Sequence, residues 1–248
     1  MAGVVAVIPA RYASTRFPGK PLVPLLGRPM VVRVLERARR IPGVDRVLVA
    51  TDDDRIAAAV RGAGGEAVMT PADCPTGSDR ACRAVEGLAC EVVLNLQGDE
   101  PALDPAAVGA LVALVRSDPA LPMATLASPL RSEEEFADPD VVKVAIGEEG
   151  RCLYFSRSPI PFLRGAAFAE APVYRHVGVY AFRREFLARF AAWPQGRLER
   201  AESLEQLRAL ERGVPVRAAV VEWAPVAVDT PEDVPRAEAA LRAQGETG

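Results

Sequence analysis

Three basic side chains lie close together in the loop that follows the first apolar run of the chain. Arg11, Arg16 and Lys20 stand in this loop, whereas the first carboxylate of the sequence is Glu36. A protein with a net charge of -3 therefore gathers positive charge at one place. Guanidinium groups and an ammonium are the usual means of holding phosphate oxygens, so the loop predicts a phosphate-binding site. A solvated basic loop is the alternative interpretation.

The same loop is neither of the two common glycine-rich phosphate loops. Small residues at Ala13, Ser14 and Gly19 would let the backbone approach a polyphosphate closely. However, no glycine stands five residues before Gly19, so the pattern of a P-loop fails, and no G-x-G-x-x-G opens the first helix. The second absence argues against an NAD-dependent oxidoreductase.

Two aspartates could complete a site for a metal-bound nucleotide. Asp99 follows the apolar run 92–96, and Asp229 precedes a helix start in which Thr230 and Asp233 form a capping-box pattern. The cap leaves Asp229 unexplained. Carboxylate oxygens are the ligands that Mg²⁺ prefers, so the two residues are a candidate metal pair. The alternative is that both are solvated loop acids.

The composition excludes several other classes of protein. His176 is the single histidine, and the four cysteines lack C-x-x-C spacing, which disfavours zinc sites and redox pairs. A sequence pI of about 5.5 argues against a nucleic-acid coat. No apolar run reaches the roughly 18 residues that span a bilayer, and the N-terminus lacks the basic start of a signal peptide. We therefore expect a cytoplasmic protein with no nucleic-acid or membrane partner.

Short apolar runs alternate with amphipathic segments along the first half of the chain. The expected strands are Val4–Ile8, Arg46–Ala50, Glu66–Met69 and Val92–Leu96. The expected helices are Pro29–Arg40, Asp53–Arg61, Ser78–Gly87 and Pro105–Arg116. This alternation predicts a mostly parallel sheet covered by helices on both faces. Ligands of such sheets bind beyond the carboxyl ends of the strands, which is where the basic loop and Asp99 lie.

The second half is less regular, and it predicts a mixed sheet with a smaller second lobe. The expected strands are Met123–Ser128, Val141–Ile146, Val173–Phe182 and Val216–Val221, and the expected helices are Leu198–Arg212 and Pro231–Gln244. No linker or repeat interrupts the chain, so residues 1–248 are interpreted as one domain. Within it we expect a nucleotide-binding part at about 1–122, a lobe at about 123–200, and a return to the main sheet over 201–248.

Taken in order, the motifs of the chain resemble those of the 3-deoxy-manno-octulosonate (Kdo) cytidylyltransferases, a family of sugar nucleotidyltransferases. The motifs are VIPARYASTRFPGKPL (7–22), VLVATDD (47–53), NLQGDEP (95–101), MATL (123–126), VVKV (141–144), LYFSRSPIP (153–161), RHVGVYAF (175–182), ESLEQLR (202–208) and VDTPED (228–233). The resemblance covers nearly the whole chain. It implies a three-layer, Rossmann-like α/β nucleotidyltransferase fold and a homodimer. It also implies Mg²⁺-dependent transfer of CMP from CTP to the anomeric hydroxyl of Kdo, for lipopolysaccharide biosynthesis.

The resemblance further implies a role for each matching residue. Arg11, Arg16 and Lys20 would bind the triphosphate and stabilise developing charge, while Asp99 and Asp229 would hold Mg²⁺. The rest of the nucleotide site would comprise Pro9, Ala10, Ser14, Thr76, Gly77, Ser78 and Arg80. The sugar acid would be faced by Gln97, Arg157, His176, Tyr180 and Gln206. His176 is expected to donate a hydrogen bond to the sugar and not to act as a general base.

Two departures from the family pattern bear on these roles. The turn at 76–80 is TGSDR where the family often has SGTER, and Ala227 stands where a glycine is common. Two alternative functions stay open: a cytidylyltransferase for another acidic sugar, such as a sialic acid or amino-Kdo, and a non-catalytic nucleotide-binding module. Of 30 basic residues, Lys20 and Lys143 alone are lysine, and no mechanism is assigned to Lys143.

Overall fold

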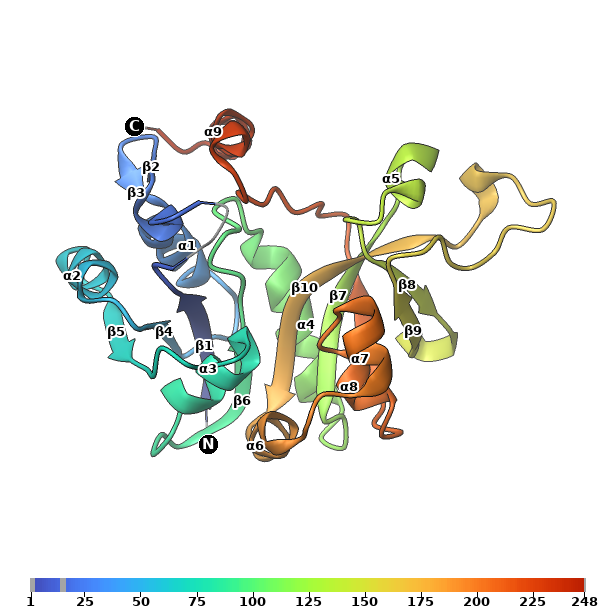
Figure 1. Cartoon of the computed structure of the whole chain (residues 1–248), viewed down its shortest axis with the longest axis horizontal. Coiled ribbons are helices and arrows are strands. Elements are labelled where there is room, and N and C mark those ends of the chain that lie inside the picture. Colours follow the sequence, from blue (N-terminus) through green and yellow to red (C-terminus); the bar gives the residue numbers. More distant parts are fainter. Residues whose placement is uncertain (1–2, 14–16, 248) are drawn as a thin grey trace.

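The protein is built around one mixed β-sheet with helices on both faces (Figure 1). The computed structural model describes residues 3–13 and 17–247. The strands are β1 (Gly3–Ala10), β2 (Pro24–Leu25), β3 (Arg28–Pro29), β4 (Arg46–Thr51), β5 (Glu66–Met69), β6 (Cys90–Asn95), β7 (Met123–Pro129), β8 (Lys143–Ile146), β9 (Cys152–Ser156), β10 (Tyr174–Arg183) and β11 (Val216–Val220). The helices are α1 (Met30–Ala38), α2 (Asp54–Gly62), α3 (Gly77–Ala84), α4 (Pro105–Ser117), α5 (Glu133–Ala137), α6 (Arg184–Ala192), α7 (Arg197–Glu202), α8 (Leu207–Leu210) and α9 (Val234–Ala243).

The sheet is parallel except at β10 and at the β8–β9 pair. The strand order is β11-β7-β10-β6-β1-β4-β5, and β10 runs antiparallel to both β6 and β7. The outer end of β10 also pairs with β8, which in turn pairs with β9. The expected α/β fold with a mostly parallel sheet is therefore confirmed. Because β1, β4 and β6 are parallel neighbours, the loops that follow them meet at one edge.

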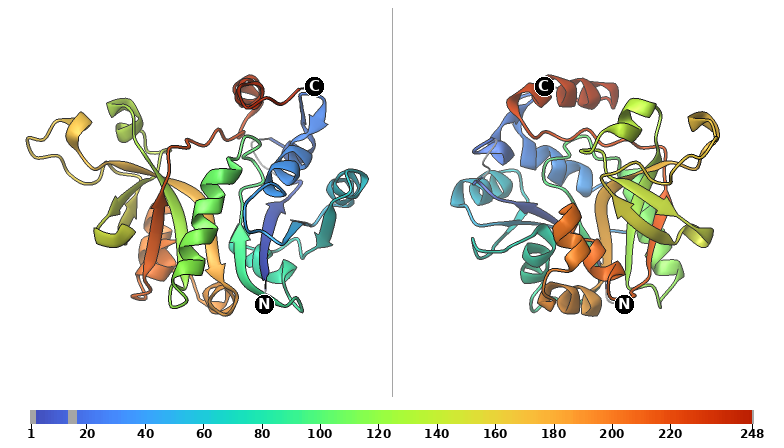
Figure 2. Two further views of the ribbon diagram at one scale, coloured as in Figure 1. Left: turned by 180° about the vertical axis from the view of Figure 1, so that it is seen from behind. Right: turned by 45° about the vertical axis from the view of Figure 1, so that its right-hand side comes forward.

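Alternating residues of β1 point into two separate cores, as the period of a strand requires. Val5 and Val7 pack in the core that includes α3 and α6, whereas Val4 and Ile8 pack in the core that includes α1 and α4. The helices accordingly form two outer layers: α3 and α6 to α8 lie in front of the sheet in Figure 1, and α4 comes forward when the molecule is seen from behind (Figure 2). Burial on both faces explains why β1 is apolar along most of its length.

A small third core fixes the C-terminal segment over the edge of the sheet. Leu25 of the β2–β3 hairpin, Val228 and Leu241 of α9 are fully buried together. In addition, the backbone N–H of Val228 donates to the Asp99 carbonyl at 3.0 Å. The segment before α9 thus returns to the loop that follows β6, and α9 covers the hairpin near the C-terminus (Figure 1).

The expected single helix Leu198–Arg212 is wrong. The segment forms two short helices, α7 and α8, which are separated by Ser203 in the left-handed conformation (φ 54°). The spacing of Leu204, Leu207 and Leu210 is helical. However, Glu205 and Gln206 lie in the connection between the two helices, and their side chains form hydrogen bonds with Thr76 and Tyr180. Sequence patterning also missed β9, α5 and α6.

In the described part of the chain, no helix is both long enough and apolar enough to cross a lipid bilayer.

Candidate active site

A cavity of about 490 Å³ opens at the edge of the sheet where β1 and β6 end. It is lined by the backbone after β1, by the turn before α3, by the loop after β6 and by the segment before α9. The lining residues are Pro9, Ala10, Arg11, Lys20, Pro21, Met30, Cys74, Pro75, Thr76, Gly77, Arg80, Gln97, Gly98, Asp99 and Asp229. Ten of these were predicted as site residues from the sequence. The fold therefore places Arg11 and Lys20 of the predicted phosphate loop in one cavity with both predicted metal ligands.

Lys20 joins the two predicted metal ligands. Its ammonium Nζ lies 2.8 Å from Asp99 Oδ2 and 3.3 Å from Asp229 Oδ1. Lys20 begins a 3-10 turn after the basic loop, and its side chain is only 14% exposed, so it is fixed at the base of the cavity. Two carboxylates from distant parts of the chain thus converge on one point. This is the arrangement that a divalent cation bound between them would need.

The loop that carries Asp99 passes close to the end of β1. A Cβ atom on Gly98 would lie 2.4 Å from the Pro9 carbonyl oxygen, so only glycine fits there. The neighbouring Glu100 is turned inward, and burial, together with the negative charge of Asp99, raises the pKa of Glu100 to about 8. Adjacent acids thus have different environments: Asp99 faces the cavity and Glu100 is buried as a neutral acid near pH 7.

The basic loop is only partly described. Arg11 is exposed and lines the cavity, and the neighbouring Tyr12 ring carries the guanidinium of Arg55 at 3.5 Å from its centroid. This stacking holds the beginning of the loop against the first turn of α2. Ser14 and Arg16, which were predicted to bind the nucleotide, lie outside the described residues.

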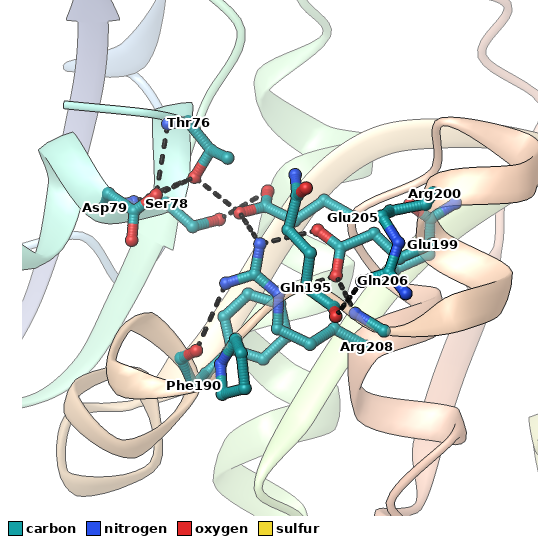
Figure 3. Close-up of polar contacts among 12 residues, drawn as sticks. Thr76, Ser78, Asp79, Phe190, Gln195, Glu199, Arg200, Glu205, Gln206 and Arg208 are labelled. Atoms are coloured by element: carbon teal, nitrogen blue, oxygen red, sulfur yellow. Dashed lines mark hydrogen bonds and ion pairs between the residues drawn. The ribbon is translucent and has the colours of Figure 1, made fainter. Parts of the chain in front are cut away.

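The turn before α3 forms the opposite wall of the cavity. Thr76 caps α3 and completes a capping box with Asp79, which leaves the backbone of Gly77 facing the cavity. Figure 3 shows that this turn meets Glu205 from the α7–α8 connection: Thr76 Oγ1 donates to Glu205 Oε1 at 2.6 Å, and Ser78 Oγ donates to Oε2 at 2.9 Å. Burial raises the pKa of Glu205, and the two hydroxyl groups oppose that effect.

Two predicted nucleotide-binding residues have internal partners. Ser78 is fully buried, does not line the cavity, and accepts a hydrogen bond from Asn95 Nδ2 at 3.1 Å while it donates to Glu205. Arg80 lines the cavity, but its guanidinium donates to Thr70 Oγ1 at 2.6 Å and lies 3.1 Å from Asp52 Oδ2. These contacts hold the residues of the cavity wall in place from the side away from the cavity.

The predicted sugar-binding residues lie beside this cavity, along β10 and the α7–α8 connection. Gln97 links the two areas, since it lines the cavity and donates from Nε2 to the Gly178 carbonyl of β10 at 2.6 Å. Farther along β10, Tyr180 OH donates to Gln206 Oε1 at 3.0 Å. Gln206 is 2% exposed, and its Nε2 is a buried donor without a partner among the described residues. An orphaned buried amide is costly unless a ligand satisfies it.

His176 is a neutral side chain in an aromatic environment. Its ring centroid lies 4.9 Å from that of Phe155 and 5.5 Å from that of Tyr180, and burial lowers the pKa of His176 to about 3. Thr125 Oγ1 lies 2.9 Å from His176 Nε2 and donates to the Val179 carbonyl at 2.8 Å. Since a hydroxyl has one hydrogen, Oγ1 accepts the hydrogen bond from Nε2, which assigns the Nε2–H tautomer. Nδ1 is consequently left as an acceptor.

Arg157 stands apart from the other sugar-binding candidates, just after β9. Its backbone N–H donates to Glu202 Oε2 at 2.9 Å, and its Nε donates to the Glu202 carbonyl at 2.9 Å. Glu202 ends α7, so Arg157 is tied to the segment that carries Glu205 and Gln206. Glu205 itself was missed in the sequence, although it is the direct neighbour of Gln206 in the ESLEQLR motif.

A cavity with cations and facing carboxylates, at the carboxyl edge of a mostly parallel sheet, has the features that a nucleotidyltransferase needs to hold a nucleoside triphosphate. Comparison with known proteins agrees with that class. A family model described as cytidylyltransferase matches residues 5–218. The chain is 49% identical to the 3-deoxy-manno-octulosonate cytidylyltransferase of Syntrophotalea carbinolica over 96% of its own length and 98% of the relative's. It is 51% identical to the same enzyme of Anaeromyxobacter dehalogenans, over 98% and 99% of the two chains.

The chain belongs to the 3-deoxy-manno-octulosonate cytidylyltransferase family, and it is an enzyme of the nucleotidyltransferase class. A solved structure of CMP:2-keto-3-deoxy-manno-octonic acid synthetase complexed with CTP superposes with a TM-score of 0.93 at 44% identity, over 99% of this chain and 100% of that one. The 8-amino-3,8-dideoxy-manno-octulosonate cytidylyltransferase of Shewanella baltica is 47% identical, over 96% of this chain and 98% of the relative.

We expect His176 to stay neutral down to about pH 5, because its folded-state pKa is about 3, whereas the unfolded imidazole takes up a proton near 6.5. The folded state therefore loses stability as the pH falls from about 6.5 toward 3, by about 2 kcal/mol at pH 5. As the single histidine, its ring protons give one NMR signal to follow. A titration midpoint near 6.5 would contradict this prediction. In a His176→Gln control, unfolding free energy should depend less on pH.

Proposed function

We propose that this enzyme transfers CMP from CTP to the anomeric hydroxyl of Kdo and releases pyrophosphate. The observation that supports this proposal best is the convergence of Lys20, Asp99 and Asp229 in the cavity, beside the exposed Arg11. In the reaction, the hydroxyl oxygen forms a bond to the α-phosphorus of CTP. The bond from that phosphorus to the β-phosphate oxygen breaks, and the hydroxyl proton is lost. Such chemistry depends on positioning and charge neutralisation, which these side chains supply.

We infer that Asp99 and Asp229 hold Mg²⁺. The donor set fits, because two hard carboxylate oxygens face the same point and the cavity beside them leaves room for phosphate oxygens and water. When bound, the ion supplies charge neutralisation of the triphosphate and lowers the pKa of the attacking hydroxyl. In this structure the Lys20 ammonium takes the point between the two carboxylates. An ion bound there would replace it and leave the ammonium for the phosphates, while Arg11 would bind phosphate oxygens at the rim.

The base and the sugar are assigned to opposite sides of the phosphate site. The backbone at Pro9, Ala10 and Gly77 would receive the cytidine, with the Glu205 contacts holding that turn in place. The orphaned Nε2 of Gln206 would donate to the sugar acid, and His176 would accept a hydrogen bond at Nδ1. This reverses the polarity expected for His176 from the sequence, because Thr125 uses the Nε2 hydrogen.

The direct test is pyrophosphate release by the purified protein with CTP, Mg²⁺ and one sugar acid at a time. We expect turnover with Kdo, and a higher kcat/KM for Kdo than for 8-amino-3,8-dideoxy-manno-octulosonate or a sialic acid. Preference for either analogue would overturn the sugar assignment and leave the enzyme class intact. Folded protein that binds CTP but turns over no sugar would support the non-catalytic module instead.

A second prediction addresses the metal ligands. Asp99→Asn and Asp229→Asn should each lower turnover roughly 100-fold or more, because several kcal/mol of charge stabilisation depends on the bound ion. Asparagine keeps the shape of the side chain, so thermal midpoints should stay close to that of the wild type. Glu232→Gln is the matched control, because Glu232 is an exposed carboxylate in the same segment as Asp229. Wild-type turnover in both aspartate variants would refute the metal assignment.

We also infer a cytoplasmic homodimer whose product supplies lipopolysaccharide biosynthesis. CTP is a cytoplasmic metabolite, and β9 and the segment after it present apolar side chains to solvent: Leu153 of β9 is 58% exposed and Phe162 is 86% exposed. Burying them against a second copy would remove apolar surface from water. Sedimentation velocity should show a dimer that Phe162→Asp shifts toward monomer, and a wild-type monomer at micromolar concentration would contradict the inference.

A further inference from the structure

Lys143 is a buried ammonium outside the cavity. Its side chain is 0% exposed, and Nζ donates to the backbone carbonyl of Asp138 at 2.7 Å. Within the described ranges, 3–13 and 17–247, this carbonyl is its one hydrogen-bond partner. Burial lowers the pKa of the amine, with the nearby Asp138 and Glu202 opposing that effect. A buried cation with one acceptor is unfavourable for stability, so packing alone is a poor explanation for lysine at this position.

The carbonyl that Lys143 holds belongs to a turn that reaches Arg157. Asp138 ends α5, and the next residue, Pro139, accepts a hydrogen bond at its carbonyl from Arg157 Nη1 at 3.0 Å. Asp140 Oδ1 lies 3.8 Å from the same nitrogen. The ammonium and the guanidinium therefore bind successive carbonyl groups of one turn. If the hydrogen bond from Lys143 to the Asp138 carbonyl is lost, the Pro139 carbonyl that binds Arg157 is no longer held in position.

The other side of Arg157 is held by Glu202. Arg157 Nε donates to the Glu202 carbonyl, and Ser156 Oγ donates to Glu202 Oε1 at 2.7 Å. Ser156 lies directly opposite Lys143 in the β8–β9 pairing, and Arg157 is the residue that follows Ser156. Lys143 and Arg157 therefore lie at the same edge of the sheet. Of the guanidinium nitrogens, Nη2 has no partner among the described residues, which leaves one donor group for a ligand.

We propose that Lys143 is a positioning residue for the sugar acid, because it fixes the turn at 138–140 so that Arg157 presents Nη2 to the sugar's carboxylate. The proposal rests on the proposed function and on the role in sugar binding that the family resemblance implies for Arg157. A guanidinium that is already oriented loses less side-chain entropy when it binds a carboxylate. Binding of the sugar should therefore depend on Lys143, whereas the nucleotide side is built from other elements.

The kinetic test uses Lys143→Met, which removes the ammonium and keeps most of the side-chain volume. We expect KM for Kdo to rise roughly tenfold while KM for CTP stays within about twofold. Val144→Ala is the matched control: Val144 is the next residue of β8, and its fully buried side chain packs in the core that includes α3 and α6. This control should lower the thermal midpoint without changing KM for Kdo.

A double-mutant cycle tests whether Lys143 acts through Arg157. In an Arg157→Ala background, adding Lys143→Met should raise KM for Kdo by less than about twofold, because the positioned group is already gone. Losses that multiply across the two sites, or an unchanged KM for Kdo in folded Lys143→Met, would overturn the proposal. If Lys143→Met does not fold, Pro139→Gly in the exposed turn takes its place, with a raised KM for Kdo expected and an unchanged one contradicting the proposal.

Hydrogen–deuterium exchange supplies a readout that needs no turnover. Peptides that cover 138–142 and 156–158 should exchange faster in Lys143→Met than in the wild type, and Val144→Ala should leave the turn at 138–140 protected. If the wild type turns over no sugar, the proposed function fails, and the exchange result still decides the role of Lys143. Equal exchange in the Lys143→Met variant and the wild type would show that the ammonium does not fix the turn.

Discussion

The architecture of the site depends on one electrostatic constraint, the meeting of two carboxylates around the ammonium of Lys20. Asp99 and Asp229 would repel each other if they were brought together alone, and a cation between them removes that cost. The surrounding elements serve to maintain this contact. The Val228 amide binds the Asp99 carbonyl, α9 packs on the β2–β3 hairpin, and Gly98 lets the loop pass the end of β1. Segments that are far apart in the sequence, around Lys20, Asp99 and Asp229, therefore meet at the site.

Most of the first half of the fold could be predicted, because its signals are local. Strands such as β1 and β4 are short apolar runs, and α3 begins at a capping box that is visible in the sequence. The prediction failed for Leu198–Arg212, where tertiary contacts override a helical pattern of leucines. Glu205 forms a hydrogen bond with the turn that caps α3, and Gln206 forms one with β10. The backbone leaves the helical conformation at Ser203, between α7 and α8.

The candidate site was predictable in its residue types but not in its connections. Arg11, Lys20 and Asp99 could be chosen from charge and position after strands, and Asp229 because the helix cap beside it leaves it unexplained. Only the folded chain brings both aspartates within hydrogen-bonding distance of Lys20. Sequence patterns contain no information on which hydroxyl faces inward. For that reason Ser78 was placed toward the nucleotide, although it is buried against Asn95 and Glu205, and Glu205 was overlooked.

The antiparallel strand β10 has a mechanical consequence. β10 forms hydrogen bonds with β6 along one side and with β7 along the other, so the phosphate edge and the sugar side share one continuous sheet. A hinge between them would have to break a ladder of backbone hydrogen bonds. The two sides of the site are thus held in register by the strands themselves. The connection from β9 to β10 lies outside these ladders and extends away from the body of the molecule (Figure 2).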